Sequence, residues 1–139
     1  MNIKLCNKCK EVKNVSEFYA DKSKRDGLHT NCKVCKQKRI DRIKEIKQEY
    51  YRLFGGCIVC GYNKSFHCID FHHIDHNTKE YAISKLTDNA ESKIRKELYK
   101  TIPLCRNCHG EHHAGVGQNT DYFIKIHEDK TRAWNLVYR

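Results

Sequence analysis

Four Cys-x-x-Cys pairs are the feature that most restricts how this chain can fold. They use eight of its nine cysteines and are Cys6/Cys9, Cys32/Cys35, Cys57/Cys60 and Cys105/Cys108. Each pair places two thiolates on one tight turn, and two pairs complete a closed tetrahedral zinc site. Joining pairs that are neighbours in sequence closes shorter loops than crossed pairing. We therefore predict two structural Zn²⁺ ions, one held by the first two pairs and one by the last two.

The composition makes such metal ions necessary. Only 39% of the 139 residues are hydrophobic, and small cores of this kind usually need metals or disulfides. The sequence shows no charged-then-apolar leader and no run that could span a bilayer, so we expect a cytoplasmic, intracellular protein without a membrane partner. In that reducing compartment cysteine pairs are expected to hold metal, with disulfides as the alternative.

The charge is strongly positive, with 27 Lys+Arg against 17 Asp+Glu and a net charge of +10. A small basic protein with metal knuckles most often binds nucleic acid, although a merely basic surface is the simpler alternative. Residues 1–36 form the first predicted unit, a four-cysteine zinc module. It has so little apolar surface that zinc must supply much of its folding free energy.

The remaining chain divides into three parts. Apolar residues at helical spacing predict a basic linking helix over 37–56, whose Lys38, Arg39 and Arg42 either contact phosphate or form a solvated face. Residues 57–117 form a second zinc domain with a strand near 68–74, a helix capped by Thr87 or Asp88, and a helix from Cys105 onward. Residues 118–139 are a tail whose aromatic side chains are expected to dock on the core.

Histidines gather near the last cysteine pair. His109 and His113 are four residues apart on the last predicted helix of the zinc domain, so both imidazoles face one side and can share a metal ion. His72 and His73 occupy adjacent strand positions and must point to opposite faces. One of these two can bind a metal while the other has a different role.

These motifs resemble a known family. The segments Cys57-x-x-Cys60-Gly61, Phe71-His72-His73-Ile74-Asp75, Leu104-Cys105-Arg106-Asn107-Cys108-His109 and His113-Ala114-Gly115 resemble an HNH endonuclease with a structural zinc. Cys6-x-x-Cys9, Ser16-Glu17-Phe18-Tyr19 and Cys32-x-x-Cys35 resemble the zinc module that precedes many phage-type HNH proteins. The resemblance implies an α+β fold in which a small ββα-metal (HNH) domain follows a four-cysteine zinc module and a linking helix. It also implies a phage or mobile-element (homing-type) origin.

The resemblance further implies roles for individual residues. His72, His109 and His113 would bind one catalytic divalent ion, Mg²⁺ or Mn²⁺, with Ni²⁺ and Zn²⁺ as alternatives. His73 would face solvent as the general base of phosphodiester hydrolysis, and double-stranded DNA would be nicked or cut. The family's middle asparagine is replaced by Lys100.

Two consequences of that replacement are open. Either Lys100 contacts phosphate, as we also expect of Arg106, or another group such as Asn107 orients the base. For Asn107 we favour the simpler interpretation, a turn residue between Cys105 and Cys108. The main alternative function is a non-catalytic, zinc-dependent nucleic-acid-binding protein on the same scaffold. A zinc-organised protein-interaction module is a third option, which the excess of positive charge disfavours.

Overall fold

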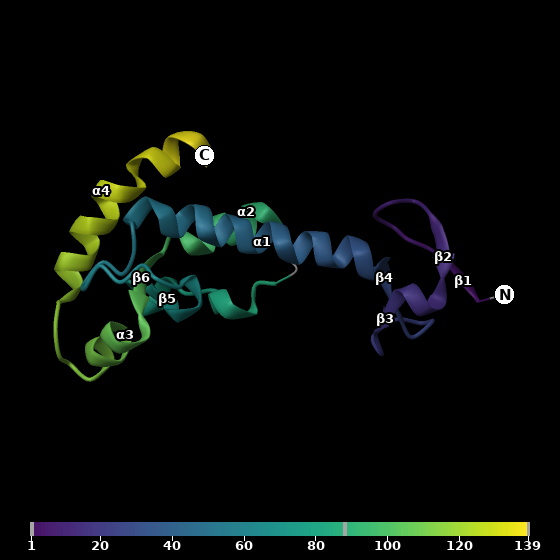
Figure 1. Ribbon diagram of the computed structural model, residues 1–139, viewed down its shortest axis with the longest axis horizontal. Helices are drawn as coiled ribbons and strands as arrows, with labels where there is room; N and C mark the ends of the chain where they lie inside the picture. Colours follow the sequence, from purple (N-terminus) through teal and green to yellow (C-terminus); the bar gives the residue numbers. More distant parts are fainter. Residues whose placement is uncertain (1, 88, 139) are drawn as a thin grey trace. The chain divides into compact units, whose positions relative to one another are not determined.

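The computed structural model describes residues 2–87 and 89–138, with a mixed α+β fold (Figure 1). The chain divides into two compact units, Met1–Arg42 and Ile43–Arg139. Helix α1 (Lys33–Phe54) begins in the first unit and ends in the second. No helix among the described residues is both long and apolar enough to cross a bilayer.

The first unit consists of two short antiparallel hairpins and the start of α1. Strand β1 (Ile3–Leu5) pairs with β2 (Val12–Asn14), and β3 (Phe18–Ala20) pairs with β4 (Leu28–Cys32). The one-turn 3-10 helix η1 (Val15–Glu17) joins the hairpins. The buried core consists of Cys6, Phe18 and Cys32. Among the described residues, phenylalanine is therefore the only large apolar side chain in that core, as expected for a unit that depends on metal.

Helix α1 covers most of the helix predicted over 37–56, but it begins earlier, at Lys33, and ends at Phe54. Its buried residues Ile43, Ile46 and Tyr50 lie three or four positions apart, so they share one face within the second unit. Gly55 and Gly56, both with positive φ, directly follow the helix. A Cβ on Gly56 would lie 2.8 Å from the Tyr62 carbonyl oxygen, so the turn needs glycine there.

The second unit contains a third antiparallel pair followed by a helix. Strand β5 (Ile69–His73) pairs over its whole length with β6 (Thr101–Cys105), and β6 leads directly into α3 (Arg106–His113) (Figure 1). Between the strands lie short 3-10 turns, including η3 (His76–Thr78) and η4 (Ile83–Lys85), and then α2 (Glu91–Leu98). The predicted cap of α2 is wrong for Thr87, because Ala90 is the N-cap and no side chain caps the helix. Asp88 lies outside the described residues.

Two hydrophobic clusters hold the second unit together. The first joins α1, η4, α2 and α4 (Thr120–Tyr138) through Ile43, Ile46, Tyr50, Ile83, Leu86, Ile94, Leu98 and Trp134. The second lies around β5, β6 and the cysteines, through Cys57, Ile69, Ile102, Leu104, Cys105, Cys108 and Phe123. Residues 118–139, expected to form a tail, thus contain a helix whose aromatic residues are part of the core.

Candidate metal centres and cleft

The first cysteine cluster brings together Cys6, Cys9, Cys32 and Cys35, whose sulfur atoms lie within 4.8 Å of one another. Burial raises the pKa of Cys6, but backbone N–H groups of Cys32, Cys9 and Lys8 more than offset this and lower it to about 6. Burial and the neighbouring thiols raise the pKa of Cys35 to about 12. Four crowded thiols can all ionise only around a cation, so the cluster can hold structural zinc.

The second cluster repeats this arrangement with Cys57, Cys60, Cys105 and Cys108, again within 4.8 Å. The Cys57 pKa is lowered to about 7, because N–H groups of Cys105, Cys60 and Val59 outweigh the effect of burial. The Cys105 sulfur also caps α3 by accepting from the Cys108 N–H. The predicted pairing of the four cysteine pairs is therefore the one that the fold brings together.

The Cys6/Cys9 and Cys57/Cys60 turns each contain the same type of backbone hydrogen bond. Lys10 N–H donates to the Cys6 carbonyl at 2.9 Å, and Gly61 N–H donates to the Cys57 carbonyl at 2.8 Å. Both donors have positive φ, 62° for Lys10 and 76° for Gly61. Glycine adopts this conformation freely, whereas lysine adopts it at a steric cost.

A third cluster consists of histidines. His72 lies on β5, and His109 and His113 lie one turn apart on α3. One ring nitrogen of each lies within 4.8 Å of the others, so the three imidazoles can hold a metal ion. The antiparallel pairing of β5 and β6 brings α3 alongside β5, which explains why residues far apart in the sequence converge.

Hydrogen bonds set the orientation of His109. Its Nδ1 lies 3.1 Å from Asp70 Oδ2, and its Nε2 lies 3.0 Å from Nε2 of His113. When Nδ1–H donates to the carboxylate, Nε2 keeps the lone pair that a metal ion requires. Asp70 is two residues before His72 and therefore on the same strand face, a signal that the sequence offered and that we missed.

His72 is buried beneath other imidazoles. Its ring centroid lies 4.7 Å from that of His112, 5.5 Å from that of His76, and 6.1 Å from that of Phe123. Burial, and then the charge of the neighbouring histidines, lowers the His72 pKa to about 3. The ring is therefore neutral at physiological pH, which is the form that binds metal.

His73 lies on the opposite face of β5, as predicted, but the expectation that it faces solvent is wrong. Only 4% of it is exposed, and its Nε2 lies 2.7 Å from Oε1 of Glu97. Burial lowers the His73 pKa, and the Glu97 carboxylate opposes that shift only in part. Glu97 is a functional candidate that the sequence did not reveal, because it contacts His73 only through tertiary packing.

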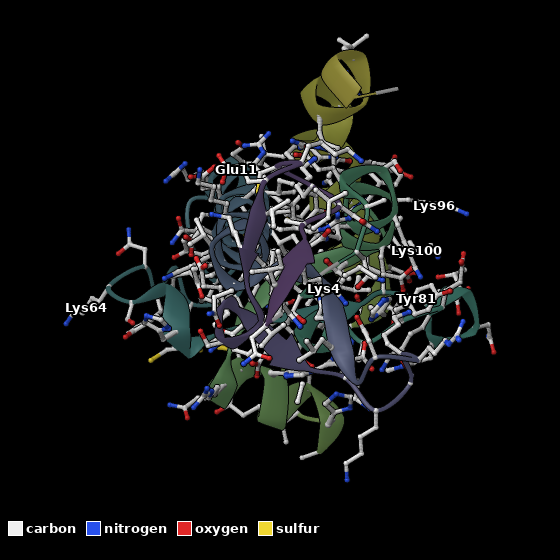
Figure 2. The ribbon with its side chains drawn as sticks, turned by 90° about the vertical axis from the view of Figure 1, so that its right-hand side faces the viewer. Lys4, Glu11, Lys64, Tyr81, Lys96 and Lys100 are labelled. Carbon is white, nitrogen blue, oxygen red and sulfur yellow. The ribbon has the colours of Figure 1, made fainter. Side chains whose placement is uncertain are left out.

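Lys100 does not present a free ammonium group for phosphate. Its Nζ donates to the carbonyl of Thr78 at 2.8 Å, to Glu80 Oε1 at 2.8 Å and to Glu97 Oε2 at 2.9 Å. All three of its protons are thus used, whereas the neighbouring Lys96 extends outward from the ribbon (Figure 2). The geometry counts against a phosphate contact by Lys100.

The other predicted DNA contacts differ in exposure. Lys38 is exposed on α1, whereas Arg39 and Arg42 are half-buried. Arg106 is exposed at the start of α3, and its Nη2 donates to the His67 carbonyl at 3.2 Å. Asn107 is exposed beside Arg106, and His73 instead hydrogen-bonds to Glu97.

A cleft of about 460 Å³ is lined by one histidine of the three-histidine cluster and by His73. His73 and His109 both line it, together with Asp70 and the lysines Lys47 and Lys79. The sequence had not singled out Lys79 as a contact. Comparisons with protein families, curated proteins and solved structures found no match.

Proposed function

We propose that the protein is a metal-dependent DNA endonuclease of the HNH family, with β5, β6 and α3 as its ββα-metal core. The observation that carries the proposal is the cleft that both His73 and His109 line. His109 belongs to a cluster of three histidines that can hold a metal ion, and His73 lies outside that cluster with its Nε2 2.7 Å from the Glu97 carboxylate. A metal-binding group and a separate base on one cleft are the elements of metal-assisted hydrolysis.

His72, His109 and His113 would hold the divalent ion, which supplies positive charge to the phosphate in the transition state. His73 takes the proton from the attacking water, since a neutral imidazole is the side chain best suited to this at neutral pH. Three nitrogen ligands favour Ni²⁺ or Zn²⁺ over Mg²⁺ and Mn²⁺, which prefer oxygen ligands.

Cations around the cleft support a phosphodiester substrate. Lys47 and Lys79 border it, and Lys47 Nζ is held in place by the Ile83 carbonyl at 2.9 Å. Burial lowers the pKa of Lys47. A bound phosphate would act in the opposite direction, because a nearby negative charge favours the charged form of lysine. Together with the net charge of +10 and the exposed Lys38, these groups suit double-stranded DNA.

A plasmid assay tests the proposal. Supercoiled DNA is incubated with the zinc-loaded protein and Mn²⁺, Mg²⁺, Ni²⁺ or added Zn²⁺, and nicked and linear products are measured. We expect cleavage with at least one ion. We expect His73→Ala to lower the rate by about 10²- to 10⁴-fold, the usual contribution of a general base. His67→Ala, which changes an exposed histidine outside the cleft, is the matched control.

The outcomes separate the candidate functions. DNA binding without cleavage under any of these ions would favour the non-catalytic nucleic-acid-binding protein. Equal cleavage by the wild type and His73→Ala would reject His73 as the base. Loss of cleavage in His109→Ala together with loss of the third bound metal ion would tie the activity to the histidine cluster.

A further inference from the structure

Glu97 combines deep burial with a negative charge. Only 2% of the residue is exposed, yet its pKa is lowered to about 2. Burial by itself would raise this pKa, but hydrogen bonds from Lys100, the Tyr81 N–H, His73 and the Glu80 N–H outweigh it. A buried carboxylate that stays ionised is costly unless its partners are fixed in place.

The two oxygens of Glu97 have different partners. Oε1 lies 2.7 Å from Nε2 of His73 and accepts from the backbone N–H groups of Glu80 at 3.0 Å and Tyr81 at 3.1 Å. Oε2 accepts from Nζ of Lys100 at 2.9 Å. Lys100 is held in turn by Glu80 and Thr78, so the far side of the carboxylate is anchored.

The chemistry of this contact determines the tautomer of His73. An ionised carboxylate has no proton to donate, so His73 must donate through Nε2–H. The neutral ring then carries its lone pair on Nδ1. The contact also restricts the orientation of the ring, because His73 is buried and its Nε2 is tied to one oxygen of Glu97 on α2.

We propose that Glu97 is the positioning residue of His73, holding the ring in the Nε2–H tautomer so that Nδ1 is the nitrogen that accepts a proton. The role of Glu97 in catalysis rests on the proposed endonuclease function. Lys100 occupies the sequence position at which the resemblance predicts an orienting group. In this chain that lysine secures the carboxylate that does the orienting.

The tautomer can be measured without any nuclease activity. Imidazole ¹⁵N resonances of the full-length, zinc-loaded protein are assigned to His73 by their absence in His73→Ala. We expect a protonated Nε2 and a bare Nδ1 in the wild type, and loss of this single-tautomer signature in Glu97→Gln. A bare Nε2 in the wild type, or a His73 spectrum that Glu97→Gln leaves unchanged, would overturn the proposal.

Kinetics then separate positioning from a purely structural role. Glu97→Gln should lower kcat about 10²-fold with KM nearly unchanged, the scale expected when a reacting group is misplaced. In the His73→Ala background it should cause no further loss, because its target is gone. Equal losses in the two backgrounds would show that Glu97 acts on the fold or on DNA binding.

Glu128→Gln is the matched control, since it makes the same chemical change at an exposed carboxylate on α4. Its rate should equal that of the wild type, and a loss as large as that of Glu97→Gln would contradict a specific role for Glu97. A wild type that cleaves no DNA would reject the endonuclease proposal. The His73 resonances would still decide whether Glu97 sets the tautomer.

Discussion

The two units contain the same metal-binding motif in very different surroundings. In the first unit, the buried core consists of Phe18, Cys6 and Cys32. In the second, the cysteines border one of two hydrophobic clusters that draw on α1, α2, α4 and the β5–β6 pair. A four-cysteine site can therefore be the core of a unit or an addition to one. In the second unit it also anchors the start of α3, the helix that carries His109 and His113.

Loss of a cysteine should produce the largest difference between the units. Cys6→Ser should unfold the first unit, because structural zinc contributes apparent binding free energies on the order of 10 kcal/mol and little apolar burial remains without it. Amide hydrogen exchange, read separately for each unit, measures the effect. Metal analysis should show one fewer zinc ion per chain.

Cys57→Ser is the counterpart in the second unit. It should also cost one zinc ion, but amides of α2 and of the buried part of α1 should stay protected by the first hydrophobic cluster. Exchange should rise mainly at β6 and the start of α3, next to Cys105. Equal unfolding of both units by the two substitutions would contradict the distinction.

Truncation of a side chain in the hydrophobic core should affect the second unit and leave the first unit unchanged. Leu98 is fully buried in the first hydrophobic cluster, and Leu98→Ala should destabilise the second unit by about 3 kcal/mol through lost burial and a cavity. Leu136→Ala is the matched control, because that side chain is 81% exposed on α4. Denaturant unfolding measures both, and exchange in the first unit should not change in either variant.

Acid should weaken the second unit through Glu97. Its folded pKa of about 2 lies below the ordinary value of 4.5, so its contribution is present above pH 4.5 and is lost as the pH falls towards 2. Between pH 6 and pH 3 the loss is about 2 kcal/mol. The stability difference between wild type and Glu97→Gln should shrink by that amount over this range. A pH-independent difference would reject the depressed pKa.

The smallest expected effect concerns the two knuckle turns. Lys10 has a φ of 62°, at the position where the second knuckle has Gly61. Lys10→Gly should stabilise the first unit by about 0.5 kcal/mol, since relief of the left-handed conformation exceeds the added entropy of the unfolded chain. Gly61→Lys should destabilise the second knuckle. Zinc affinity and exchange near each turn measure both changes.

Local patterns predicted much of this protein because their partners are close in sequence. Cys-x-x-Cys spacing, the i, i+4 relation of His109 and His113, and the opposite faces of His72 and His73 follow from turn, helix and strand geometry. The buried state of His73 did not follow. Its partner Glu97 is 24 residues away on another element, and no periodic signal links the two.

The sequence by itself determined which residues can bind metal and in which pairs, because four short motifs carry the ligands and their turns. It also determined the linking helix, through apolar spacing that ends at glycine. Only the tertiary structure decided that Asp70 orients His109, that Glu97 holds His73, and that Lys100 is held by carboxylates and a carbonyl oxygen. These contacts depend on how strands and helices pack. The chemistry of a side chain does not specify which residue, distant in the sequence, will lie next to it in the folded protein.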